Sequence, residues 1–175
     1  MATRQEETYP ITRVTLTIPK PYDSVLARLQ SSIKAFDGEG LSILHHASSL
    51  ASFEAAVESM LGPHQFMQFG AIDHGRWTGL YGVRPGRRSV RLVFGNPEIA
   101  ITMIRHDYQS GLWVPVEALL VEREDGCGTD VVYVKPSTYI VRDAATVPLR
   151  EAAEALDAKL EKLWAFVSED EYLKD

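Results

Sequence analysis

Apolar and polar positions follow two different periods along this chain, and the periods predict its secondary structure. Residues 13–18 alternate between apolar and polar, as in a β-strand that buries one face. Between residues 22 and 36 the apolar positions recur every three or four residues, which predicts an amphipathic helix ended by the Asp-Gly-Glu-Gly run that follows. A second helix is predicted around residues 53–60. A short strand at residues 41–44 is one interpretation of the ambiguous segment between these helices.

The middle of the chain is dominated by predicted strands. They cover residues 66–72, 89–94, 116–121 and 131–134, with a helix at about 98–108. The run at 116–121 is almost continuously apolar, as in a central strand, and the Asp-Gly-Cys-Gly sequence after it predicts a hairpin turn. Residues 75–86 carry four glycines, too many for a regular element, and leave either a long connection or a distorted strand pair.

The last and longest predicted element is a helix of about five turns. Its apolar stripe consists of Leu149, Ala153, Leu156, Leu160, Leu163 and Val167. This stripe is too short for a coiled coil, so we expect it to pack across a sheet. The predicted order is typical of an α+β two-layer sandwich, with a mainly antiparallel sheet and helices on one face, including this C-terminal helix. We expect a single domain over residues 10–170, with loose termini at 1–9 and 171–175.

Composition narrows the function classes. The 175 residues are 45% hydrophobic and 24% charged, as in a globular protein, and the net charge of −6 argues against nucleic-acid binding. The densest basic cluster is predicted to be a solvated turn around Pro85 and Gly86; its members are Arg84, Arg87, Arg88 and Arg91.

The single cysteine, Cys127, excludes an internal disulfide and fits a reducing compartment. Without a signal-peptide core or a run of about 20 apolar residues, we expect a cytoplasmic location and no membrane partner.

The stretch Phe94-Gly95-Asn96-Pro97 predicts a corner between a strand and a helix. Glycine allows a sharp turn, Asn96 can cap the following helix, and proline suits the first helical position. Asn96 could instead donate its amide to a ligand, but capping is the favoured interpretation. Such corners often carry sites because backbone amides point outward from them.

Three stretches of the chain occur in a recognisable order: Ile72-Asp73-His74, then Leu92-Val93-Phe94-Gly95-Asn96-Pro97, and finally Ser110-Gly111-Leu112 through Pro115 with Val132-Tyr133 before Pro136. Together they resemble the bacterial and fungal family named domain of unknown function 302, over roughly residues 11–142. The resemblance implies a compact sheet with helices on one face, similar to the TATA-binding-protein arrangement, but it assigns no activity. The chain departs from the family where a glycine- and aromatic-rich stretch at 76–83 replaces an alanine- and lysine-rich helix. The tail beyond residue 145 also looks extended relative to the family.

His74 is the strongest candidate for chemistry, because imidazole can act as acid or base near neutral pH. Asp73 need not orient it, since neighbouring residues on a strand point to opposite faces. A phenol such as Tyr133 could donate a hydrogen bond to a carbonyl. The residues predicted to bind substrate are Asn96, Trp77, Tyr81, Phe94 and Trp113, although the aromatic ones could equally fill the core under a long loop.

We expect neither a metal nor another cofactor. The histidines lack the spacing of zinc sites, although His46, His74 and His106 could assemble in three dimensions. No glycine-rich phosphate-binding pattern occurs, and no cysteine or serine has the setting of a nucleophile.

The sequence supports two functions. The first is binding of a small apolar organic molecule in a pocket between the sheet and the long C-terminal helix, or at its mouth. We expect His74 and Asn96 to converge at one rim of this pocket. A cofactor-independent proton transfer, as in an isomerase, cyclase or lyase, would use His74 as the acid or base, and Tyr133 or Asn96 would stabilise the developing charge on an oxygen. The second is a non-enzymatic module that forms a homodimer or binds a partner, because Leu119 and Val121 lie on an apolar strand whose second face needs a cover.

Overall fold

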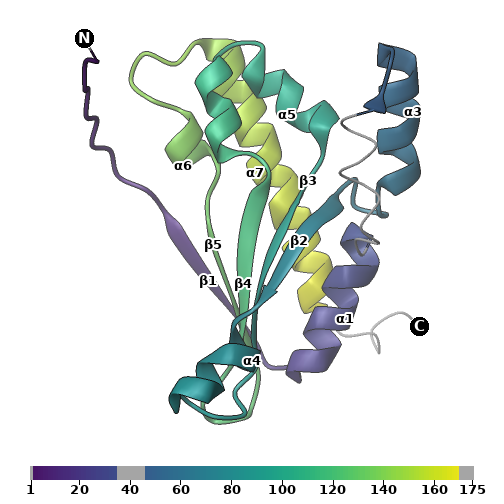
Figure 1. Ribbon diagram of the computed structural model, residues 1–175, viewed down its shortest axis with the longest axis vertical. Coiled ribbons are helices and arrows are strands. Elements are labelled where there is room, and N and C mark those ends of the chain that lie inside the picture. Colours follow the sequence, from purple (N-terminus) through teal and green to yellow (C-terminus); the bar gives the residue numbers. More distant parts are fainter. Residues whose placement is uncertain (1, 35–45, 170–175) are drawn as a thin grey trace.

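A five-stranded antiparallel sheet forms the centre of the fold, in the spatial order β1-β5-β4-β3-β2 (Figure 1). Its strands are β1 (Arg13–Ile18), β2 (Met67–Asp73), β3 (Ser89–Gly95), β4 (Val116–Glu122) and β5 (Thr129–Val134). This computed structural model describes residues 2–34 and 46–169. The apolar run at 116–121 is the middle strand, as predicted, and the hairpin turn that follows it connects β4 to β5.

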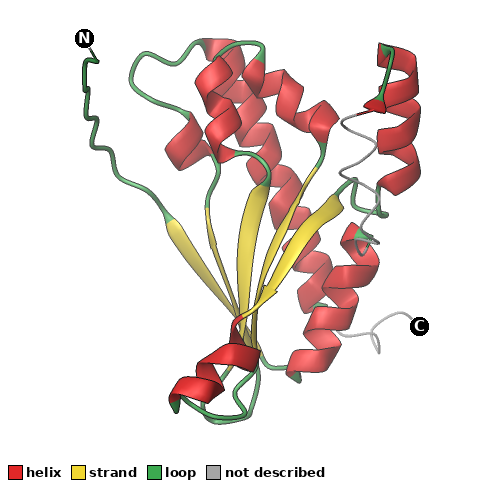
Figure 2. Ribbon diagram, viewed as in Figure 1, coloured by secondary structure: helices red, strands yellow, loops and turns green. Residues whose placement is uncertain are grey.

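Helices cover one face of this sheet and both of its ends (Figure 2). They are α1 (Tyr22–Ile33), α3 (Leu50–Met60), α4 (His74–Thr78), α5 (Pro97–Ile104), α6 (Ser137–Ile140) and α7 (Val147–Ser168), with 3₁₀ turns η1 (Gly79–Tyr81) and η2 (Tyr108–Trp113). The long helix α7 runs along the sheet and contacts α1, α5 and α6 (Figure 1). The predicted α+β sandwich with a long closing helix is therefore confirmed.

The core lies between the sheet and α7 and is filled by large side chains. All six members of the apolar stripe of α7 are buried, as their spacing predicts. Phe94 of β3 packs edge-on against Trp164 of α7 at 6.0 Å between ring centroids, and against Phe66 at 5.6 Å. Tyr133 of β5 contacts the same Trp164 at 5.4 Å. Burying each such side chain contributes about 1.5–3 kcal/mol, so this layer holds the helices to the sheet.

Two predicted helix ends differ from the structure. Helix α1 ends at Ile33, because Lys34 takes a left-handed backbone conformation (φ 44°). The helix end predicted near residue 36 and the strand predicted at 41–44 lie outside the described residues. Helix α5 ends at Ile104, and a separate 3₁₀ turn, capped by Asp107, takes up the rest of the predicted element.

The glycine-rich stretch at 75–86 contains a short helix and a 3₁₀ turn instead of being irregular throughout. The Asp73 carboxylate starts helix α4 by accepting the backbone N–H of Arg76 at 3.0 Å. This cap outweighs the low helix propensity of the glycines over one turn.

The basic cluster is paired with carboxylates instead of simply solvated. Arg84 and Arg87 both bind Glu124, and Arg88 binds Glu122 and Asp23. The Arg88 guanidinium also lies over the ring of Tyr22, 4.9 Å from its centroid. Because Tyr22 begins α1, these contacts fix the start of that helix to the sheet. Burial raises the pKa of the Tyr22 phenol to about 12.

Candidate functional site

The sheet face turned away from α7 forms the floor of a groove with a volume of about 900 Å³. Strand residues that alternate with the core positions line this floor, because successive side chains of a strand point to opposite faces. They are Arg13 on β1, Val132 and Val134 on β5, Glu117 and Leu119 on β4, and Ser89 and Arg91 on β3. The lining is mostly apolar, with charged groups at a few points.

Helix α4 closes one end of the groove. Its Gly75 packs directly on the segment entering β3, where an added Cβ would lie 2.6 Å from the carbonyl oxygen of Arg87. This close approach presents His74 and Trp77 to the groove, with their rings edge-to-face and the centroids 5.7 Å apart.

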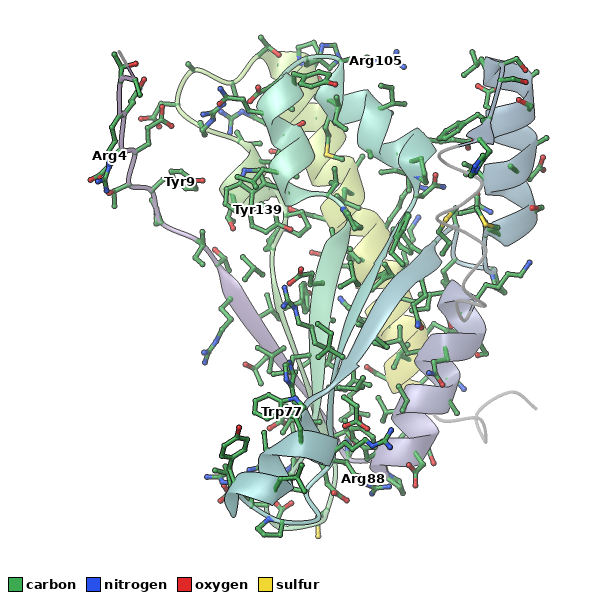
Figure 3. All side chains as sticks on the ribbon, viewed as in Figure 1. Arg4, Tyr9, Trp77, Arg88, Arg105 and Tyr139 are labelled. Atoms are coloured by element: carbon green, nitrogen blue, oxygen red, sulfur yellow. The ribbon has the colours of Figure 1, made fainter. Side chains whose placement is uncertain are left out.

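The opposite end of the groove is closed by η2 and α6. Trp113 and Tyr139 stand against each other there at 5.1 Å between centroids. Figure 3 shows Tyr139 and Trp77 at the two ends of the sheet. Burial raises the pKa of the Tyr139 phenol, so the hydroxyl stays protonated at neutral pH. The buried Asp157 of α7 holds α6 in place by accepting the backbone N–H of Ser137 at 3.0 Å.

An ion pair lies on the apolar floor between these two walls. Nε of Arg91 donates to Oε2 of Glu117 at 2.8 Å, and Nη2 donates to the same oxygen. Both side chains keep part of their surface in solvent, with exposed fractions of 41% and 45%. The groove therefore combines aromatic end walls, an aliphatic floor and a central pair of charges.

Comparison with known proteins identifies the family. The family model described as Domain of unknown function DUF302 matches residues 42–166, which is most of the chain. The chain belongs to the DUF302 family. The match includes α7 up to residue 166, so the prediction that the tail beyond residue 145 extends past the family pattern is wrong for nearly all of that helix.

A solved relative of the DUF302 family has the same fold. The crystal structure of an uncharacterized conserved DUF302 protein from Bacillus stearothermophilus superposes with a TM-score of 0.60, covering 89% of this chain and 97% of that one. The two sequences are 14% identical, so this likeness concerns the fold. No curated protein matches the chain significantly. Within residues 2–34 and 46–169, no helix has the length and apolarity needed to cross a membrane.

Three of the residues predicted from the sequence line the groove of this DUF302 protein: His74, Trp77 and Trp113. Tyr133 also borders it through its position on β5, but its ring packs against Trp164 on the helix side. Burial raises the pKa of Tyr133 as well. Its phenol is therefore turned away from His74.

The expected convergence of His74 and Asn96 is wrong. His74 follows β2 and Asn96 follows β3, and these strands are antiparallel neighbours whose register pairs Asp73 with Val90 and Met67 with Gly95. Residues that follow two antiparallel neighbours lie at opposite ends of the pair, here roughly 20 Å apart at about 3.4 Å per residue.

Asn96 is used as a helix cap. Its Oδ1 accepts the backbone N–H of Glu98 at 2.8 Å, and its Nδ2 donates to the carbonyl oxygen of Gln65 at 3.1 Å. It borders a separate apolar crevice of about 210 Å³, lined by residues that include Phe66, Phe69, Ile99, Met103 and Leu156. The strand-to-helix corner thus does adjoin a hollow, at the opposite end of β3 from His74.

Two other predicted binding residues lie outside the groove. Phe94 is 0% exposed in the core, and Tyr81 is 80% exposed on the outer side of the α4–η1 segment. Aromatic and aliphatic side chains fill most of the space between the sheet and α7, and the hollow that Leu156 of α7 borders there is the small crevice beside Asn96. The larger hollow, which His74 lines, lies on the other face of the same sheet.

Sequence analysis did not assign Arg91 or Glu117 to the site, although strand periodicity held the necessary signal. On β3 the buried residues are Val90, Leu92 and Phe94, which turns Arg91 to the other face, and the same alternation on β4 places Glu117 there. Within the described part of the chain, which includes the three histidines considered for a metal site, no group of three His, Cys, Asp or Glu side chains could hold a metal ion.

Proposed function

We propose that this protein binds a small, mainly apolar organic molecule in the groove on the open face of its sheet. The observation that carries the proposal is a hollow of about 900 Å³ with aromatic side chains at both ends. Ligand sites in proteins commonly occupy about 300–1,000 Å³ and combine a mostly apolar lining with a few polar groups. Trp77 and Trp113 offer flat surfaces for a ring, and Leu119, Val132 and Val134 provide an aliphatic base.

Proton transfer is the chemistry that these residues support best. His74 lies on the groove wall, and histidine is the residue that enzymes use most often for general acid–base catalysis. The proposed reaction class is an isomerisation, cyclisation or elimination that needs no cofactor. Since Asn96 and the Tyr133 ring face elsewhere, the catalytic part of this proposal rests on His74.

Two exposed aromatic residues, Trp77 and Tyr108, provide a matched test of binding, because of the two only Trp77 lines the groove. N-phenyl-1-naphthylamine, an uncharged probe that fluoresces in apolar sites, should bind the protein with a rise in fluorescence. Trp77→Ala should weaken this binding because it removes part of the groove wall, whereas Tyr108→Ala should leave it unchanged, because Tyr108 is 88% exposed and does not line the groove. Equal affinity in the two variants would refute the groove as the binding site.

Native mass spectrometry of the purified protein tests the chemistry. A retained small molecule would supply the ligand for a turnover assay. His74→Gln should then abolish turnover while probe binding and melting temperature stay close to those of the unchanged protein. Loss of stability with unchanged turnover would assign His74 a structural role instead.

Exposed apolar side chains favour a second candidate function, the pairing of two copies through their open sheet faces. Leu80 beside one end wall is 85% exposed and Leu112 at the other is 78% exposed. Exposed apolar groups of this size commonly mark interaction surfaces. Analytical ultracentrifugation should show a dimer that Leu80→Glu and Leu112→Glu dissociate; a monomer at high concentration would refute this candidate.

A further inference from the structure

The charges of the groove run against the charge of the whole protein. The chain carries a net charge of −6, yet the described residues that line the groove include Arg13, Arg91 and a single carboxylate, Glu117. These three side chains therefore give the groove an excess of one positive charge. An excess charge inside a mostly apolar hollow attracts a ligand of opposite sign, because field lines concentrate where walls have a low dielectric constant.

The guanidinium of Arg91 is only partly used. Its Nε and Nη2 both donate to one oxygen of Glu117, whereas its Nη1 has no hydrogen-bond partner within the described part of the chain. A guanidinium can bind carboxylates along two edges, and the Nη1–Nη2 edge is the less occupied one here. Partly exposed ion pairs are worth only about 0–1 kcal/mol, so Glu117 is a weak competitor for an incoming anion.

We propose that the ligand of the groove is an aromatic carboxylate, with its carboxylate on Arg91 and its ring on the aliphatic floor between Trp77 and Trp113. This inference rests on the proposed function and names the class of molecule that the same site selects. A planar carboxylate matches the fork of the guanidinium in two parallel hydrogen bonds. Glu117 holds the guanidinium in position on the floor, and its own charge opposes that of the ligand.

A pair of probes of equal shape separates charge recognition from apolar binding. 2-Naphthoate and 2-naphthamide share the ring system, but only the first carries a negative charge. Their dissociation constants can be measured by quenching of tryptophan fluorescence, since Trp77 and Trp113 line the groove. We expect 2-naphthoate to bind about tenfold more tightly than the amide, as a charge-assisted hydrogen-bond pair implies.

Two substitutions should change this preference in opposite directions. Arg91→Met keeps the aliphatic stem and should remove the preference for 2-naphthoate. Glu117→Gln keeps a hydrogen-bond acceptor for Arg91, removes the opposing charge, and should tighten 2-naphthoate binding while leaving the amide unchanged. Arg105→Met is the matched control, because it removes the same charge from the position that follows α5, outside the groove, and should have no effect.

Each outcome decides between the inference and the proposed function. Equal affinity for the two probes, with both weakened by Trp77→Ala, would overturn charge recognition and leave the groove as an apolar binding site. Tight binding of 2-naphthoate that Arg91→Met and Arg105→Met change equally would also overturn it. Failure of both naphthalene probes and of N-phenyl-1-naphthylamine to bind would overturn the proposed function itself. Should Arg91→Met fail to fold, Glu117→Gln still decides the question: tighter binding of 2-naphthoate with unchanged binding of the amide supports charge recognition, and equal changes for both probes overturn it.

Discussion

Replacing Gly75 with alanine should displace the wall that α4 builds at one end of the groove. The new Cβ would lie 2.6 Å from the carbonyl oxygen of Arg87 and 2.9 Å from the backbone nitrogen of Ser89, whereas ordinary contacts begin at 3.4 Å. The backbones must therefore separate by about 0.8 Å at the closer atom. Forced overpacking of this kind typically costs about 1–3 kcal/mol.

The segment that opposes Gly75 has little freedom to yield. Nε of Arg87 donates to the carbonyl oxygen of Glu122 at 2.7 Å, and Arg88 is bound to the Glu122 carboxylate. We therefore expect α4 to move instead of β3, which shifts His74 and Trp77 away from the floor. Binding of N-phenyl-1-naphthylamine should weaken together with the free energy of unfolding.

Gly79→Ala is the matched control for this experiment. Gly79 has helical backbone angles, and its added Cβ would meet only the Cα of Pro85, at 3.7 Å. Both substitutions gain about the same helix propensity, so the difference in unfolding free energy between them isolates the steric cost. Urea denaturation followed by tryptophan fluorescence should place Gly75→Ala about 1–3 kcal/mol below Gly79→Ala. Equal stability with unchanged probe binding would refute the close packing of α4.

Three further predictions concern side chains outside the groove. Burial beside Arg28 lowers the pKa of His64. The contribution of neutral His64 to stability is therefore fully present above the ordinary pKa near 6.5 and is lost as pH drops through the lowered value. In a series of melting temperatures measured against pH, His64→Gln should reduce the slope in this range. Asp157→Ala should destabilise the protein by about 1–3 kcal/mol in urea, because the backbone N–H of Ser137 loses its acceptor. Phe94→Ala should cost about 3–5 kcal/mol by the same assay, since its buried ring meets two others edge-on.

Each of these predictions has a contrary result. An unchanged pH slope in the His64 variant would assign the acid sensitivity to other groups. Full stability of Asp157→Ala would show that the start of α6 finds another acceptor. A Phe94→Ala variant that loses probe binding without losing stability would return that residue to the ligand site.

The sequence by itself determined the strands, the longer helices and the class of fold, whereas the short elements α4, η1, η2 and α6 were not predicted. Alternation along β1 and the apolar stripe of α7 follow from backbone geometry, because a strand repeats every two residues and a helix every 3.6. The hairpin between β4 and β5 and the cap at Asn96 depend on a few neighbouring residues, so local chemistry was sufficient for them.

Only the tertiary structure decided where the site lies. Trp77 and Trp113 line opposite ends of one groove, because β3 and β4 run side by side between them. Asn96 follows the strand that bears Arg91, and it lies at the opposite end of that strand from His74. The antiparallel order could have revealed that error, since the carboxyl ends of two neighbouring antiparallel strands lie at opposite ends of the pair. The choice of the open face could not be predicted locally. It depends on which side α7 covers, and that is settled by the packing of its whole apolar stripe against several strands at once.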